Sequence, residues 1–515
     1  MPGRLTPPKL SGWSPPGGGE ELCLAFDNGE AARLLVLPAW FDEANKTRHF
    51  TVEVMRRLHA AGWAAFLPDL PGCNESAAGL AVQDFALWRG AASAAARQCG
   101  ATHCLTIRAG ANLAPEGLAG WRYAPIAATA ALKALLRARI IASKEAGVIE
   151  TTDELIDVSR AEGLELAGYR IGPGMIRQMA GGALSEDGGL TDIPQREVGG
   201  GGLWLRAEPG FDAGQADRLA GIIGGPTRPS TGSGRAEEFG TAPQTARGEP
   251  VEPRAPGRRH LTFPCEGEVL AGTLDEGAHP AGLLVVSGGN ETRAGAFSGM
   301  AELAARVAAA GHPVLRFDRR GTGDSTGENA GFRGSGPDIA AAVAAFRAEV
   351  PGLRRIVGLG NCDAASALML AGGAGCDGLV LANPWTFDAE TSEQHSGAEL
   401  RRRYAEKLRN PRELARLLRG KISFAKLAGG LRRALAAGGG GGSVLAREMA
   451  GALAGYAGEA RILLAERDRT AQAFRENWPG GAWPVEICAG ASHAFAEAEA
   501  REWLFGRVVA ALRGG

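Results

Sequence analysis

The chain has 515 residues, of which 45% are hydrophobic and 22% are charged. A chain of this length exceeds what one ordinary hydrophobic core accommodates, so two or three domains are expected in a soluble globular protein. The 56 Lys and Arg residues are balanced by 57 Asp and Glu residues, which argues against nucleic acid or an anionic membrane as a partner.

The cysteines and the N-terminus predict a cytoplasmic protein. The eight cysteines are irregularly spaced and form no CxxC pair, which disfavours a zinc site or a redox pair and is typical of reduced thiols. Residues 1–20 are rich in Pro and Gly, and the chain has no apolar run of signal-peptide or membrane-span length. We expect a disordered tail over residues 1–20, no transmembrane segment, no cofactor and no metal.

One pattern occurs twice in the chain. Residues 34–37 (LLVL) precede a helical stretch and the segment AAGWAAFLPDLPGCNES, and residues 283–286 (LLVV) precede a helical stretch and AAGHPVLRFDRRGTGDS. With a constant offset of 249 residues, the matching pairs are Gly62 and Gly311, Asp69 and Asp318, Gly72 and Gly321, and Ser76 and Ser325. A fixed offset over such a length indicates a duplicated fold.

Each copy predicts a mostly parallel sheet flanked by helices, because continuous apolar strands alternate with helical stretches. The fold class is therefore α/β, with two tandem domains of this kind. The first is expected over residues 21–225 and the second over 259–515, with a helical lid at about 386–455. Residues 226–258 predict a flexible linker, because they contain many Pro and Gly and few large apolar side chains.

The first copy is expected to be non-catalytic. In α/β enzymes of this kind a nucleophile stands in the turn between a strand and the next helix. The corresponding segment of the first copy, THCLTIRAGANLA, has Arg108 near the tip of the turn and neither Ser nor Cys there. No histidine lies between His103 and His260, so a base downstream of this turn is absent. The first domain also looks shortened, without a clear final strand and helix after residue 210. It would dock on the second domain, bind a ligand, or be a remnant.

In the second copy, Cys362 is a candidate nucleophile. The segment GLGNCDAAS joins a short apolar strand to a helix and has the small-x-nucleophile-x-small form of a nucleophile elbow, with Ala364 in place of the usual Gly. The helix N-terminus would favour the reactive thiolate. The alternative is a small buried cysteine in a tight bend.

Two downstream residues complete a catalytic constellation. In this architecture the order along the chain is nucleophile, acid, histidine. Asp468 follows the strand RILLA, and His493 lies in a loop before the last helix. All three candidates follow strands, at the edge where ligands bind in open parallel sheets. The alternatives are a solvated turn aspartate and a capping histidine.

The expected roles follow from acyl chemistry. Cys362 attacks an acyl carbonyl, His493 accepts and later returns the proton, and Asp468 orients the imidazole. Backbone N–H groups would hold the oxyanion: that of Asp363, and that of Gly289 or Asn290 in the loop SGGNETR. The alternative for this loop is a simple glycine-rich strand exit.

The insert contains the basic run RRRYAEKLRNPRELARLLRGK. Such a run is read either as a solvated amphipathic helix face or as a basic lid that attracts an acidic substrate. The sequence favours the solvated face.

The second half resembles the exosortase A system-associated hydrolase 1 family, a branch of the α/β-hydrolases. The segments that carry this resemblance are GGNETRAG, FDRRGTGDSTG, GLGNCDAAS, LVLANPW, ERDRTAQAF and SHAFA. The first half resembles the companion hydrolase 2 family through LPAWFDEANKTRHF, FLPDLPGCNES and LELAGYRI. The resemblance implies a fusion of two hydrolase-like proteins in a bacterial exopolysaccharide and protein-sorting setting.

The leading hypothesis is a hydrolase of an ester, thioester or related acyl bond. Its substrate would be a small acyl compound, free or linked to a lipid or saccharide, and its partner proteins are unknown. An acyltransferase of the same fold is the alternative among enzymes, because an acceptor alcohol or amine can replace water. A non-enzymatic scaffold of the same system is the alternative from another class, because fold alone does not set chemistry.

Overall fold

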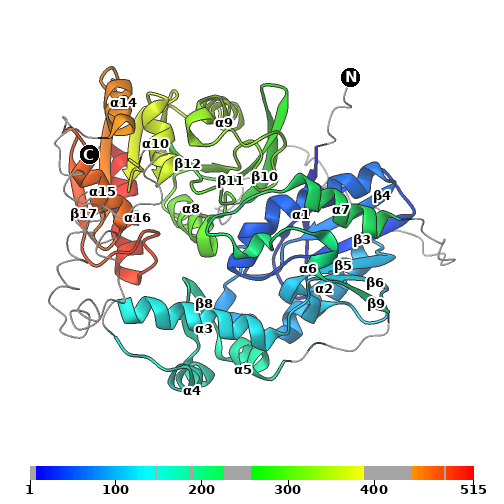
Figure 1. The fold of residues 1–515 in the computed structure, drawn as a ribbon. Helices are drawn as coiled ribbons and strands as arrows, with labels where there is room; N and C mark the ends of the chain where they lie inside the picture. The colour runs from blue at the N-terminus through cyan, green and yellow to red at the C-terminus, as the bar shows by residue number, and fades with distance from the viewer. Residues whose placement is uncertain are drawn as a thin grey trace, which may run out of the picture.

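The computed structural model describes residues 7–145, 148–182, 184, 189–225, 257–387, 443–480 and 483–514. Two α/β halves lie side by side, the first drawn in blue to green and the second in green to red (Figure 1). The predicted α/β class, with mostly parallel sheets flanked by helices, is confirmed. The predicted linker lies almost entirely outside the described residues, and so do residues 388–442 of the predicted lid.

The first half contains a seven-stranded sheet in the order β1-β2-β4-β3-β5-β6-β9. Its strands are β1 (Lys9–Trp13), β2 (Glu21–Phe26), β3 (Ala32–Leu37), β4 (Trp63–Pro68), β5 (His103–Ile107), β6 (Gly120–Tyr123) and β9 (Leu190–Ile193). β2 is antiparallel to β1 and β4, and the strands from β4 to β9 pair in parallel. A separate hairpin comprises β7 (Leu164–Leu166) and β8 (Tyr169–Ile171).

Helices cover both faces of this sheet. They are α1 (Asp42–Ala60), α2 (Phe85–Gln98), α3 (Ala128–Glu145), α4 (Thr152–Glu162), α5 (Pro173–Gly181), α6 (Gln195–Val198) and α7 (Ala213–Gly224), with short 3₁₀ turns η1 (Leu80–Val82), η2 (Arg108–Leu113) and η3 (Leu203–Leu205). Buried side chains of α1 and α7 form the core on one face, and those of α2, α3 and α5 form it on the other.

The second half contains an eight-stranded sheet in the order β10-β11-β13-β12-β14-β15-β16-β17. Its strands are β10 (Arg258–Cys265), β11 (Glu268–Asp275), β12 (Ala281–Val286), β13 (Val314–Phe317), β14 (Arg355–Asn361), β15 (Gly378–Ala382), β16 (Glu459–Ala465) and β17 (Val485–Cys488). The first seven positions repeat the order of the first sheet, which supports the inferred duplication.

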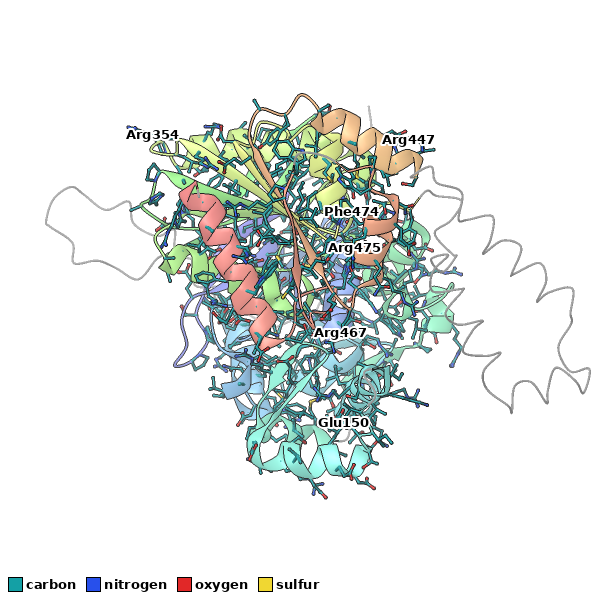
Figure 2. The ribbon with its side chains drawn as sticks, turned by 90° about the vertical axis from the view of Figure 1, so that its left-hand side faces the viewer. Glu150, Arg354, Arg447, Arg467, Phe474 and Arg475 are labelled. Atoms are coloured by element: carbon teal, nitrogen blue, oxygen red, sulfur yellow. The ribbon has the colours of Figure 1, made fainter. Side chains whose placement is uncertain are left out.

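Helices of the second half divide between the two faces of its sheet. They are α8 (Gly299–Ala309), α9 (Gly336–Glu349), α10 (Asp363–Leu370), α14 (Val444–Leu453), α15 (Arg469–Asn477) and α16 (Ala498–Arg513), with turns η4 (Ala296–Ser298) and η5 (Phe332–Gly334). α9, α10, α14 and α15 pack on one face, where Phe474 is buried (Figure 2), and α8 and α16 pack on the other. None of the helices described is both long and apolar enough to cross a bilayer.

Two expectations about the ends of the first half are wrong. The predicted disordered tail contains β1, whose residues pair with β2 from Lys9 to Trp13. A final helix does exist, because α7 packs its buried face against α1. An eighth strand, by contrast, is absent from the described part of the first sheet.

Buried ion pairs join the two halves. Arg48 of α1 donates from Nε to Asp324 Oδ1 at 2.7 Å and from Nη1 to Asp69 Oδ1 at 2.9 Å. Each of these side chains is 5% exposed or less. Because buried charges are costly unless they are paired and hydrogen-bonded, this cluster requires both halves to be in contact.

Glu75 extends the cluster into the second sheet. Its two carboxylate oxygens accept from Arg316 Nη1 at 2.9 Å and Nη2 at 2.7 Å. Arg293, which lies 3.7 Å from Glu75, donates to Asp318 and Asp324. We call Arg48, Asp69, Glu75, Arg293, Arg316, Asp318 and Asp324 the interdomain charge cluster.

Candidate active site

Cys362 occupies a strained turn between β14 and α10. Its φ is 61° and its ψ is −126°, a conformation that is unusual for a residue with a side chain. A Cβ on Gly360, two residues earlier, would lie 2.6 Å from the backbone of Ala364. The turn therefore requires a residue without a side chain at this position, as a nucleophile elbow does.

The structure brings the three predicted residues together. The His493 Nδ1 atom lies 2.9 Å from Asp468 Oδ2, and the His493 ring is hydrogen-bonded to the Cys362 thiol. Asp468 is 8% exposed and also caps α15 by accepting from the N–H groups of Thr470 and Ala471. The aspartate is thus held in place independently of the histidine.

Electrostatics make His493 a strong base. Burial disfavours the charged imidazolium, but hydrogen bonds to Asp468 and Cys362 outweigh it and raise the pKa of His493 to about 10. Burial also raises the pKa of the Cys362 thiol, and the hydrogen bond to His493 offsets part of that rise. The imidazolium of His493 and the thiolate of Cys362 therefore stabilise each other, so that the proton lies on His493 when Cys362 is ionised.

We expect the alkylation of Cys362 by iodoacetamide to quicken as the pH rises through and above neutrality, because burial raises the pKa of the thiol. In His493→Ala the interaction that lowers this pKa is lost, so the alkylation profile should move to higher pH. Mass spectrometry of the Cys362 peptide against pH measures both profiles. A profile unchanged by the substitution would contradict the hydrogen bond.

The predicted oxyanion donors are not equivalent in the structure. The Gly289 N–H donates to Asp363 Oδ1 at 2.7 Å, so this donor is occupied. Asn290 has a φ of 59°, and its N–H has no acceptor among the described residues. The Asp363 N–H points to the Cys362 sulfur. Of the predicted donors, the Asn290 N–H is therefore the one without an acceptor among the described residues, and the Asp363 N–H is directed at the nucleophile itself.

Two asparagines that the sequence analysis missed hold the histidine loop. Asn361 and Asn383 each donate from Nδ2 to the His493 carbonyl, at 3.2 and 3.0 Å. The Asn383 side chain also donates to Asn361 and accepts from the Ala465 N–H. Asn383 directly follows β15 and is fully buried. An amide at the end of a predicted central strand was the signal from which its supporting role could have been inferred.

The corresponding turn of the first half has a similar backbone conformation but no nucleophile. Arg108 has a φ of 54° and stands where Cys362 stands in the second half. Its guanidinium donates to both carboxylate oxygens of Glu43 at 3.0 Å and lies 4.2 Å from the centre of the Trp204 ring. An ion pair thus replaces the nucleophile.

Residues of the first half border the second half's site. The Asn45 side chain accepts from the Thr292 N–H at 2.9 Å, at the end of the loop that carries Gly289 and Asn290. Burial raises the pKa of Glu208, Asp363 raises it further, and Arg319 and His493 oppose this. These contacts make the first half a wall of the site.

Residues 283–506 match the model of a family described as the alpha/beta hydrolase family. None of the curated proteins matches the chain. Solved structures similar to the chain include an esterase of Pyrococcus furiosus, which is 15% identical over 50% of this chain and 91% of that chain, with a TM-score of 0.34. A proline iminopeptidase of Mycobacterium smegmatis is 16% identical over 50% and 98%, with a TM-score of 0.33. A putative hydrolase of Agrobacterium vitis is 15% identical over 50% and 100%, with a TM-score of 0.32.

Proposed function

We propose that the second half hydrolyses an ester, thioester or related acyl bond through Cys362, with His493 as the base and Asp468 as the residue that orients it. The observation that carries this proposal is the hydrogen-bonded chain from the Asp468 carboxylate through the His493 ring to the Cys362 thiol. The family match over residues 283–506 supports hydrolysis as the reaction class.

The proposed reaction has two steps. The Cys362 thiol transfers its proton to His493 Nε2, because Nδ1 faces Asp468, and the sulfur attacks the acyl carbon. The resulting oxyanion accepts from the N–H groups of Asp363 and Asn290. As the tetrahedral intermediate collapses, the leaving group takes the proton from His493 and an acyl thioester on Cys362 remains.

Water completes the cycle. It attacks the thioester while His493 removes one of its protons, and the collapse of the second tetrahedral intermediate releases the carboxylic acid and restores the thiol. We also propose that the protein works in a bacterial exopolysaccharide or exosortase system and in the cytoplasm. The sequence resemblance supports the first of these assignments, and the sparse cysteines support the second.

Asp363 is a positioning residue in this proposal. Its carboxylate accepts from Gly289 and from Arg319 Nη2 at 3.3 Å, and Arg319 is fixed by Ser335 at 3.1 Å. A Cβ on Gly288 would lie 2.7 Å from Asp363 Oδ1. The carboxylate thus clamps the oxyanion loop to the elbow and leaves the Asn290 N–H free.

We expect Asp363→Ala to lower kcat by about tenfold to a hundredfold with little change in KM, because the loop would lose its clamp. Asp363→Asn keeps an acceptor for Gly289 and should retain most of kcat. Both variants remove the charge that raises the pKa of Cys362, so both should shift the alkylation profile of the thiol to lower pH. Equal kcat values for Ala and Asn would contradict the clamp.

A further inference from the structure

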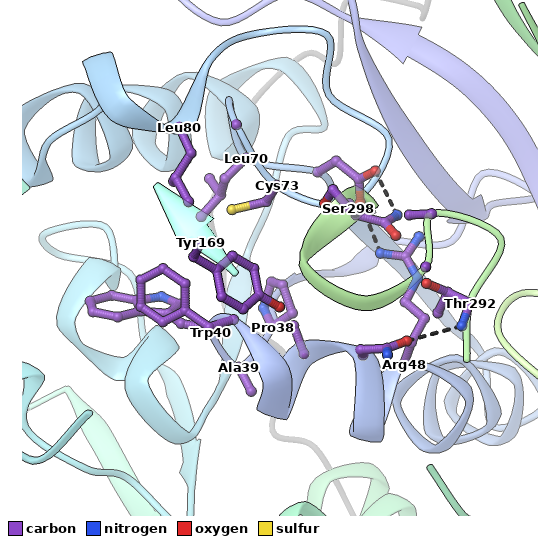
Figure 3. A pocket seen from close by; sticks show the side chains of 18 residues that line it. Pro38, Ala39, Trp40, Arg48, Leu70, Cys73, Leu80, Tyr169, Thr292 and Ser298 are labelled. Carbon is purple, nitrogen blue, oxygen red and sulfur yellow. Dashed lines mark hydrogen bonds and ion pairs between the residues drawn. The ribbon is translucent and has the colours of Figure 1, made fainter. Parts of the chain in front are cut away.

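A cleft separates the two halves at the carboxyl ends of β3 and β4. Its inner end is lined on the first half by apolar and aromatic side chains, namely Trp40, Phe41, Leu70, Leu80 and Tyr169, and on the second half by Thr292, Ala294, Gly295 and Ser298. In Figure 3 the Tyr169 ring lies between Trp40 and Ser298, with Cys73 and Leu70 beside it. Ligands of open α/β sheets bind at this edge of the sheet.

The outer end of the cleft is wider and is lined by three arginines, Arg170, Arg258 and Arg501, and by one glutamate, Glu302. It has a volume of about 340 Å³, and Leu80, Tyr169 and Ser298 line both ends, so the two compartments adjoin. Arg170 and Arg501 contribute guanidinium groups to this outer end. The cleft therefore has an apolar interior and a charged mouth.

Arg501 has one buried donor, its Nε, that has no hydrogen-bond partner among the described residues. Its side chain is 12% exposed, it lies 5.2 Å from the centre of the Phe297 ring, and it donates to the Gly168 carbonyl at 3.2 Å. The carboxylates of Glu165 and Glu302 lie 3.8 Å away, beyond the distance of a charge-assisted hydrogen bond. Both glutamates are partly exposed, so either can turn toward water and leave the guanidinium to a ligand.

The wall between the compartments is strained. Phe297 and Ser298 have φ values of 45° and 59°, two consecutive left-handed residues that are not glycine. Such strain persists where the surroundings enforce it, often at ligand sites. The Tyr169 ring packs edge-on against the Phe297 ring, with 6.4 Å between the ring centres, which ties the first half to this wall.

We propose that the cleft binds a single-chain amphipathic anion, with its aliphatic chain among the aromatic side chains and its carboxylate or phosphate head at Arg501 and Arg170. The first half would then be a ligand-binding domain that retained the pocket of its fold and lost the nucleophile. This site is distinct from Cys362, since neither Cys362 nor His493 lines it.

Isothermal titration of the full chain with hexanoate, octanoate, octyl phosphate and octanol tests the proposal. The affinity should rise by about fourfold for each CH₂ added from hexanoate to octanoate, and octanol should bind about tenfold more weakly than octanoate because it lacks the charged head. The tighter of octanoate and octyl phosphate identifies the head group.

Three substitutions locate the ligand. Ala44→Phe places a ring in the apolar end and should abolish binding. Arg501→Gln should weaken it about tenfold and Arg170→Gln by a smaller factor. Arg475→Gln, on the exposed face of α15 (Figure 2), is the control and should change the affinity less than twofold. Thermal unfolding checks that each variant is folded.

Absence of saturable binding by every anion would overturn the proposal, and so would binding that is unchanged in both Ala44→Phe and Arg170→Gln. Binding that survives Ala44→Phe but disappears when Cys362 is carboxamidomethylated would place the chain in the site of the second half. The readout is binding alone, so failure of the proposed hydrolysis would leave this test intact.

Discussion

Replacement of Cys362 by Ala is expected to lower kcat/KM for 4-nitrophenyl esters and short acyl thioesters by about 10⁴-fold or more, to the background rate. The reason is that Cys362 is the described thiol that is hydrogen-bonded to a histidine, His493, whereas the Cys265 thiol donates to the Asp338 carboxylate at 3.4 Å. Steady-state assays of the purified full chain measure the effect. His493→Ala should have a similar effect, because the loss of one member of a catalytic unit costs about as much rate as the loss of all its members.

Cys104→Ala is the matched control. Cys104 is fully buried in β5 of the first half, away from any base proposed here, and its replacement should leave kcat/KM unchanged. Turnover that is equal in wild type and Cys362→Ala would contradict the proposed nucleophile and favour a scaffold. Turnover that appears only when an acceptor alcohol or amine is added would identify an acyltransferase.

Replacement of Glu75 by Gln is expected to lower the free energy of unfolding of the full chain by about 3–5 kcal/mol. Glu75 is completely buried and binds Arg316 through both oxygens. An amide of the same shape leaves the guanidinium groups of Arg316 and Arg293 without their charge partner across the interface. Chemical denaturation monitored by circular dichroism measures the change, provided that wild type and variant both unfold reversibly.

Unfolding measured as a function of pH tests whether the ionised carboxylate of Glu75 stabilises the folded protein. Burial disfavours the Glu75 carboxylate, but Arg316 and Arg293 outweigh it and hold its pKa well below the ordinary value of 4.5. The stabilisation is therefore complete above pH 4.5 and is lost as the pH falls toward the pKa of the folded state. The gap between wild type and Glu75→Gln should narrow in acid. Glu116→Gln, an exposed residue before β6, should unfold like wild type at every pH.

The local parts of the site could be predicted from the sequence, because their chemistry lies in short segments. The elbow at Cys362 needs small residues at fixed positions, and the chain order of nucleophile, acid and histidine restricts Asp468 and His493 to the ends of later strands. The duplication was visible as a constant offset. Arg108 likewise stands at the tip of its turn, where the sequence pattern placed it.

The contacts between the halves could not be predicted in this way. Arg48 and Asp324 are 276 positions apart, and no local pattern shows that two charged side chains share a buried site. The sequence also left Gly289 and Asn290 as equal oxyanion candidates. Only the position of the Asp363 side chain, which takes the Gly289 N–H, separates them.

The interdomain charge cluster has a consequence for how this protein could be encoded. Each half carries part of a buried network of ion pairs, so each half by itself would leave charges without the partners that the other half supplies. The covalent connection between them raises the effective concentration of one half around the other. We therefore expect two separate polypeptides, one that ends at residue 225 and one that begins at residue 257, to associate through the complementary charges of this cluster.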